Sequence, residues 1–173
     1  GWNTDSSATT ASYVAGNSYD TTADLDLYAV WSANSYDITY YGNGGTGSTT
    51  AGTWTTGDPA YTIEFNGFSR DGYTFVGWST TSTDVSGDPS YDEGDSYSTS
   101  ANLNLYAIWD ANDYTITYYG NSSDGGTVPS NGTYTTGGTA YVISSDQPTR
   151  TGYTFLGWNT DSSATTASYV AGN

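Results

Sequence analysis

The chain has 173 residues and a formal net charge of −16, from 18 acidic side chains against two arginines, with no lysine, histidine or cysteine. This charge repels nucleic acid, so we expect no nucleic-acid partner, and without an apolar run of about 18 residues we expect no membrane insertion within these residues. Because histidine, cysteine and lysine, which supply the usual general bases and activated nucleophiles, are missing, we also expect no enzymatic activity.

Two nested repeats organise the chain. Residues 1–17 recur letter for letter at 157–173, and Leu-Tyr-Ala-Val-Trp at 27–31 returns as Leu-Tyr-Ala-Ile-Trp at 105–109, 78 residues later. The building block is therefore about 78 residues, used in alternating pairs within a period of 156. Insertions confined to loops are what repeated domains tolerate, and the second copy carries two extra residues in one loop.

This spacing predicts three domains. Residues 1–34 are the C-terminal part of a repeat, 35–111 are a complete repeat, and 112–173 are the N-terminal part of the next one. Joining 112–156 to 1–34 would give about one block, so separate subunits could exchange segments. The duplicated seventeen residues favour the other reading, a window from a long covalent array.

Taken in chain order, the elements of the complete repeat are strands. In residues 37–41, period two places Ile38 and Tyr40 on one face, which we expect to be buried, and the turn residues Asn43-Gly44-Gly45 follow. Further alternating runs predict strands at 61–65, 73–78 and 103–109. Any helix is short and lies near 79–101, so the fold is mainly β, and α+β at most.

Three of these motifs carry a family resemblance. Ile-Thr-Tyr-Tyr-Gly-Asn-Gly-Gly at 38–45, Arg-Asp-Gly-Tyr-Thr-Phe-Val-Gly-Trp at 70–78 and Leu-Tyr-Ala-Ile-Trp at 105–109 follow one another in one block. This order resembles the Listeria–Bacteroides repeat, the family that includes the B-repeat of internalin B. The resemblance implies tandem, small β-grasp-like (ubiquitin- or SUMO-like) domains in secreted or cell-surface proteins, with a spacer or adhesive role and no catalytic residues.

The second tyrosine of each Tyr-Tyr pair is the candidate interface residue. Tyr41 and Tyr119 are predicted on the face opposite Tyr40 and Tyr118, and so on the surface. We interpret this exposed position as a domain–domain or chain–chain contact, which makes other copies of the same protein the expected partner. Binding of cell-surface glycans by ring stacking is the alternative.

Two further sets of side chains could carry chemistry. Acidic residues crowd one loop, where their oxygens could hold Ca²⁺, although the spacing fits no EF-hand and a solvated acidic loop is favoured; they are Asp84, Asp88, Asp92, Glu93 and Asp95. No other cofactor is expected. Asn121 and Asn131 each begin an N-glycosylation sequon, which chance explains best in a chain so rich in serine and threonine.

Together these features predict a structural role. We expect a segment of an extracellular fibre, stalk or giant cell-surface adhesin, whose near-identical blocks stack head to tail and associate with one another. The alternative is a cell-surface binding module that recognises glycans or host proteins.

Overall fold

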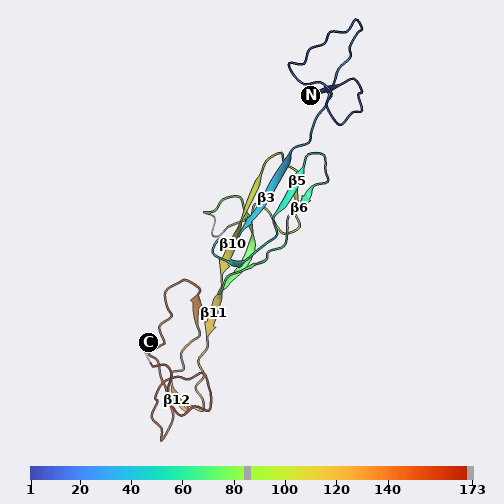
Figure 1. The fold of residues 1–173 in the computed structure, drawn as a ribbon. Coiled ribbons are helices and arrows are strands. Elements are labelled where there is room, and N and C mark those ends of the chain that lie inside the picture. The colour runs from blue at the N-terminus through green and yellow to red at the C-terminus, as the bar shows by residue number, and fades with distance from the viewer. Residues whose placement is uncertain (84–86, 171–173) are drawn as a thin grey trace.

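The computed structural model describes residues 1–83 and 87–170, and all regular structure within them is β. Figure 1 shows three bodies strung along one line, which we call the first segment (residues 1–34), the middle segment (35–111) and the third segment (112–170). The prediction of a mainly β fold is confirmed. The described residues of 79–101, where we placed any helix, form the end of one strand at Ser79, a β-bridge at Tyr91, the short strand β9 (Ser96–Tyr97), and otherwise turns, bends and irregular chain.

A curled four-stranded sheet forms the middle segment, in the order β5-β3-β10-β8. Its strands are β3 (Ser35–Tyr41), β5 (Gly52–Thr55), β8 (Tyr73–Ser79) and β10 (Leu103–Ala111). The two central strands, β3 and β10, run parallel, with Leu103 opposite Ile38 and Tyr106 opposite Tyr41. The pairs β10–β8 and β3–β5 are antiparallel. The last strand of the repeat is therefore inserted at the centre of the sheet.

Two-stranded pairs flank this sheet. β4 (Thr46–Gly47) pairs with β7 (Phe68–Ser69), and β6 (Tyr61–Thr62) pairs with β9. The strand predicted at 61–65 is thus shorter than expected. Ile63 is fully buried, but Phe65 is 73% exposed. The backbone bonds continue to Ile63, whose amide donates to the carbonyl of Asp95 (2.7 Å), but the next amide, that of Glu64, donates to the Tyr40 hydroxyl instead (2.8 Å).

Alternation in β3 decides which side chains enter the core. Ile38 is fully buried and Tyr40 is 7% exposed, as predicted from period two. The Tyr40 ring meets the edge of buried Trp78 at 4.9 Å between ring centres, and Phe75 meets the same indole at 5.0 Å. Burial of side chains of this size contributes roughly 1.5–3 kcal/mol each, which a small unit without disulfides needs.

Hydrogen bonds that involve side chains join the turn after β3 to the central strand β10. Asn43 and Gly44 adopt positive φ angles of 45° and 94°, as their turn chemistry predicts. The Asn43 side-chain amide donates to the carbonyl of Ala107 (3.0 Å). In the same place the Trp109 indole donates to the carbonyl of Gly42 (2.9 Å). β10 is therefore held by side-chain bonds as well as by its ladders.

The first and third segments form smaller sheets. In the first, β1 (Trp2–Asn3) pairs with β2 (Tyr28–Ala29). In the third, β11 (Asp113–Ile116) pairs with β13 (Gly132–Thr135), and β12 (Gly125–Gly126) pairs with β14 (Pro148–Thr149). The duplicated residues fold alike at both ends, because the indole-bearing residues Trp2 and Trp158 each bridge to a tyrosine eleven positions later.

Alkaline pH should destabilise the middle segment through two tyrosines whose pKa the fold raises. Burial, and next the hydrogen bond from Tyr40, raise the pKa of Tyr61 above its ordinary value, and burial also raises the pKa of Tyr97. Because unfolded tyrosines ionise near pH 10, the stability present below that pH should fall as the pH rises further. Urea midpoints at pH 8 and pH 11 measure the loss, and it should be smaller in Tyr61→Phe. An equal loss in that variant would contradict the assignment.

Candidate self-association site

The structure places both candidate tyrosines on the surface, but in different surroundings. Tyr41 is 42% exposed and Tyr119 is 76% exposed, whereas their neighbours Tyr40 and Tyr118 are buried. The Tyr41 ring stacks on Tyr106 of β10, with ring centres 4.7 Å apart and planes inclined by 15°. The residue of the first segment that corresponds to Tyr106 is Tyr28. The Tyr119 ring is therefore largely exposed, whereas the equivalent Tyr41 ring is partly covered by Tyr106 of its own sheet.

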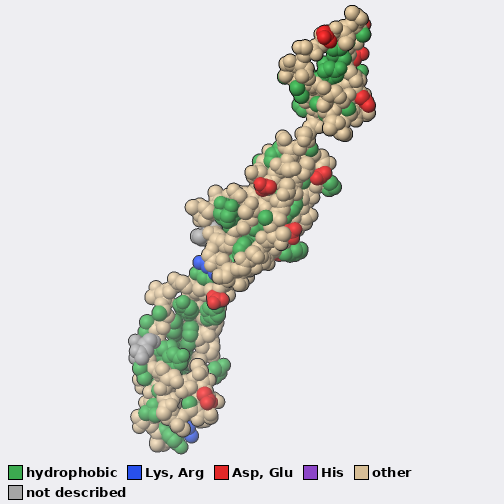
Figure 2. Space-filling view, viewed as in Figure 1, with side chains coloured by type: hydrophobic (Ala, Val, Ile, Leu, Met, Phe, Trp, Pro, Cys, Tyr) green, Lys and Arg blue, Asp and Glu red, His purple; other side chains and the backbone are tan. Residues whose placement is uncertain are grey.

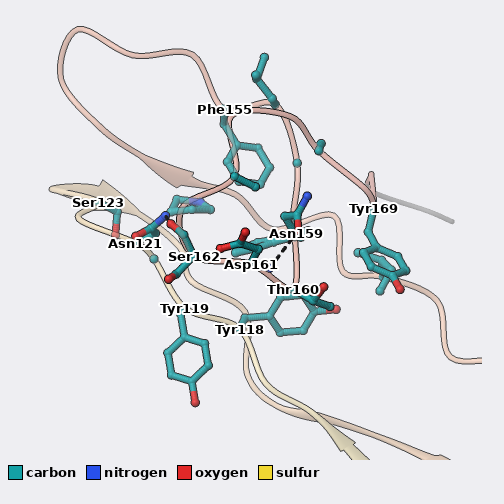
Figure 3. A pocket seen from close by; sticks show the side chains of 18 of the residues that line it. Tyr118, Tyr119, Asn121, Ser123, Phe155, Asn159, Thr160, Asp161, Ser162 and Tyr169 are labelled. Carbon is teal, nitrogen blue, oxygen red and sulfur yellow. Dashed lines mark hydrogen bonds between the residues drawn. The ribbon is translucent and has the colours of Figure 1, made fainter.

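A groove of about 840 Å³ opens beside Tyr118 in the third segment. It lies between residues 115–119 and 153–159, which correspond to β3 and β8 of the middle segment. Figure 3 shows Tyr118 and Phe155 at this opening and Tyr119 directed away from it. In Figure 2, apolar side chains are visible in the hollow of this segment. β10 occupies the corresponding space in the middle segment.

The walls of the groove keep the aromatic arrangement of the complete repeat. Ring centres are 4.8 Å apart for Tyr118 and Trp158 and 5.0 Å apart for Phe155 and Trp158, and both pairs meet edge to face. The matching pairs around Trp78 have nearly the same geometry. However, Trp158 is only partly buried, while Trp78 is fully buried. The walls of the groove therefore match the residues that pack around Trp78 in the middle segment.

The strand with the matching sequence lies exposed in the first segment. Leu27 is 42% exposed and Trp31 is 87% exposed, although their counterparts Leu105 and Trp109 in β10 are buried. We did not single out Leu27 or Trp31 from the sequence. The 78-residue spacing could have indicated these two residues, because a motif whose side chains are buried in one copy is expected to be buried in the other.

One acidic and one basic side chain, Asp161 and Arg150, line the groove. Asp161 accepts hydrogen bonds from the amide of Ser163 (2.9 Å) and from its hydroxyl (2.8 Å), and these bonds lower the pKa of the Asp161 carboxyl below its ordinary value. Asp5, its counterpart in the duplicated residues, makes the same two bonds with Ser7 and shows the same shift. Both carboxylates are therefore charged at neutral pH.

The acidic loop is only partly within the described residues, since Asp84 lies outside them. Glu93 accepts the amide of Asn66 and Asp95 accepts the amide of Asp92 (2.8 Å), so both carboxylates hold the loop backbone. Among the residues described, no group of three or more acidic side chains is arranged to hold a metal ion. The Ca²⁺ site, with Asp88 as a further ligand, stays a prediction.

The two sequon asparagines differ in their surroundings. The Asn121 amide nitrogen, where a glycan would attach, donates to the carbonyl of Ser162 (2.9 Å). Asn131 is exposed directly before β13. Glycosylation at either position stays a prediction.

Comparison with known families decides the identity of these units. The pattern of the Listeria-Bacteroides repeat domain matches residues 1–30, 36–108 and 114–173. The chain belongs to this family. The match confirms the resemblance that the three motifs indicated, and it covers part or all of each segment of this Listeria-Bacteroides repeat protein.

Its similarity to curated proteins is more distant. The repeat protein is 31% identical over 150 residues to one from Evansella cellulosilytica named "Putative membrane protein", and 38% identical over 97 residues to one from the same organism named "Putative Gly-rich membrane protein". These stretches cover 80% and 54% of this chain but only 20% and 11% of the relatives. No solved structure gives a significant match. Within the described residues, we find no helix with the length and hydrophobicity needed to cross a bilayer.

Proposed function

We propose that this chain is a structural segment of an extracellular fibre, stalk or giant cell-surface adhesin. Its β-grasp-like repeats stack head to tail and associate through domain–domain contacts. The mixed sheet supports the β-grasp-like part, because β3 begins the repeat and β10 ends it, yet the two lie parallel at the centre. Family membership and relatives named as membrane proteins support a place at the cell surface.

The junction between the middle and third segments carries this proposal. β10 ends at Ala111 and β11 begins at Asp113, so one residue, Asn112, separates the two strands. Figure 1 shows β11 continuing the line of β10. The Asn112 amide donates to Gly72 of the middle segment (2.9 Å), and its carbonyl accepts the amide of Thr136 of the third (3.0 Å). Each of the two segments therefore holds the linking residue by one backbone hydrogen bond.

The junction between the first and middle segments has one of these two hydrogen bonds. Asn34 corresponds to Asn112, and its carbonyl accepts the amide of Thr56, the counterpart of Thr136, at 3.0 Å. Successive repeats that share one interface geometry build a rod, since each unit fixes the direction of the next. A uniform interface of this kind suits a load-bearing or spacing role.

Substitution of Gly72 tests the junction. A Cβ at Gly72 would lie 2.7 Å from the Thr136 side chain, which must then shift. We expect Gly72→Ala to weaken the junction by about 1–3 kcal/mol, because overpacking costs that much. Gly152→Ala is the matched control, since its φ of +79° equals the +78° of Gly72 but no atom lies within 4 Å.

The measurement is the relative motion of the segments, by NMR relaxation and by small-angle X-ray scattering. Gly72→Ala should shorten the average length and decouple the tumbling of the middle and third segments, while Gly152→Ala should leave both unchanged. Identical behaviour of the two variants would remove the rigid junction on which the fibre proposal rests.

The glycan-binding alternative draws on the exposed ring of Tyr119. Aromatic faces stack on sugars, and this ring is 76% exposed. The double variant Tyr41→Ser, Tyr119→Ser separates the two functions. Loss of self-association in sedimentation supports the structural role. Loss of retention on a glycan array with unchanged sedimentation supports the alternative instead.

A further inference from the structure

The chain enters the middle segment at one end of β3 and leaves it at the far end of β10. β3 begins at Ser35, directly after Asn34, and β10 ends at Ala111, directly before Asn112. Because the two strands are parallel neighbours, the entry and the exit lie at opposite ends of one ladder. Figure 1 shows both strands running along the line that joins the three segments. Tension along the chain therefore pulls β3 and β10 lengthwise past each other.

The direction of this load decides how many hydrogen bonds resist it. When a parallel pair is pulled lengthwise from opposite ends, all bonds of its ladder are strained at the same time. When an antiparallel pair is pulled apart at its open end, the bonds break one after another. The β3–β10 ladder has four register pairs, from Ile38 with Leu103 to Tyr41 with Tyr106. These pairs share the load.

Hydrogen bonds to side chains lengthen this ladder at both ends. Before its first pair, the Asp37 amide donates to the side-chain oxygen of Asn102 (2.9 Å). Beyond its last pair, the Asn43 side chain donates to the carbonyl of Ala107 (3.0 Å), and the Trp109 indole bond lies in the same place. All three cross between the same two stretches of chain as the ladder. More bonds therefore resist the load than the backbone pairing alone provides.

Both faces of the ladder are shielded from water. On the inner face, Ile38 and Leu105 are fully buried and Tyr40 is nearly so. On the outer face, the stacked rings of Tyr41 and Tyr106 cover the last register pair. Hydrogen bonds in such surroundings are electrostatically stronger than bonds in water, and water does not readily replace them. Shielding of this kind delays the rupture of a strained ladder.

The remainder of the repeat lies outside the path of the load. Residues 42–102, which include the edge strands β5 and β8, connect the end of β3 to the start of β10 and are bypassed while the ladder holds. β11 begins one residue after β10 ends. Tension thus passes from the middle segment into the first strand of the next repeat without crossing a loop.

We propose that the middle segment is a tension-bearing clamp, in which the β3–β10 ladder and its added side-chain bonds resist stretching of the chain. This inference rests on the proposed structural role and adds resistance to tension to it. A spacer needs only a stiff junction, whereas a clamp needs this order and direction of strands. The chain has no cysteine or lysine for covalent reinforcement. Hydrogen bonds loaded together supply the resistance instead.

Single-molecule pulling of the full chain in two directions tests the clamp. Because the chain has no cysteine, introduced thiols can carry the handles at defined positions. Ala33→Cys with Asp113→Cys loads the β3–β10 ladder lengthwise. Ala33→Cys with Asp58→Cys is the matched control, because it pulls the antiparallel β3–β5 pair apart at its open end, where Ser35 lies opposite Thr55.

The measured quantity is the lifetime of the folded segment at a fixed force. Under lengthwise load the lifetime should be about 100-fold longer or more than in the control direction, because several hydrogen bonds must break together instead of singly. Rupture should release roughly 20–25 nm in one step, which is the extended length of residues 35–111 less their folded length. Equal lifetimes in the two directions would overturn the proposal.

Two asparagine variants separate resistance to force from stability at equilibrium. Asn43→Asp keeps the shape of the side chain but removes the donor to Ala107. Asn66→Asp removes a matching amide donor to the Phe68 carbonyl, also at 3.0 Å, in a turn outside the ladder. Both should lower the urea midpoint, but only Asn43→Asp should shorten the lengthwise lifetime markedly, by about 10-fold. Equal shortening in both variants would contradict the clamp.

Failure of the clamp and failure of the structural role give different results. The lifetimes under force decide the clamp, because they depend on strands within the middle segment. The scattering of Gly72→Ala and Gly152→Ala chains decides the stiffness of the junction. A stiff chain that resists both directions of pulling equally overturns the clamp alone. A flexible junction beside a long lengthwise lifetime overturns the stacking of the repeats and supports the clamp.

Discussion

Trp109→Ala is expected to destabilise the middle segment by about 3–5 kcal/mol, while Trp31→Ala should leave the unfolding of the dilute chain unchanged. The two tryptophans hold the same position of the repeat, yet Trp109 is 4% exposed and Trp31 is 87% exposed. The comparison therefore removes the same side chain from a packed and an unpacked copy of one motif.

The expected loss at Trp109 is large for a unit of this size. Its ring meets the edge of Phe75 at 5.7 Å, and its indole nitrogen donates to Gly42. Removing a buried tryptophan typically costs about 3–5 kcal/mol, and a domain of this length is stable by roughly 4–12 kcal/mol. Without a disulfide to limit the unfolded state, this loss takes a large part of that stability.

Urea unfolding followed by near-ultraviolet circular dichroism measures both variants. The protein concentration must be low enough that chains stay separate, because the chain is proposed to self-associate. A shift at Trp31 equal to that at Trp109 would mean that the first segment is packed in dilute solution, contrary to its exposure here. An unchanged midpoint for Trp109→Ala would contradict the assigned core.

Local features of the fold could be predicted from the sequence. The buried face of β3, the positive φ at Asn43 and the strands ending near Trp78 and Trp109 follow from alternation and turn chemistry among neighbours. The duplicated residues show why this works. Trp2 and Trp158 make the same bridge in different settings, because its partners lie close in sequence.

Long-range features could not be predicted in the same way. The parallel pairing of β3 with β10 joins residues 65 positions apart, and its register depends on packing that no local pattern records. Tyr41 and Tyr119 have the same motif and the same predicted face. They differ in exposure because Tyr106 covers one of them, and only the structure shows which partner each ring has.

Tyr40→Ser should destabilise the middle segment far more than Tyr41→Ser, although the two residues are adjacent. The Tyr40 ring packs on Trp78, and its hydroxyl accepts the amide of Glu64 at 2.8 Å. Losing the ring costs about 3–5 kcal/mol, and the unpaired amide adds about 1–3 kcal/mol. Tyr41 contributes the stack on Tyr106, worth about 0.5–1.5 kcal/mol.

Thermal unfolding of both variants, with Tyr118→Ser and Tyr119→Ser as the equivalent pair in the third segment, measures this difference. In a strand of period two, moving the register by one residue exchanges the two faces, so losses of equal size at positions 40 and 41 would indicate a mixture of registers. A larger loss at Tyr41 would contradict the assigned face. The third-segment pair should show smaller losses, because Trp158, on which Tyr118 packs, is only partly buried, whereas Trp78 is fully buried.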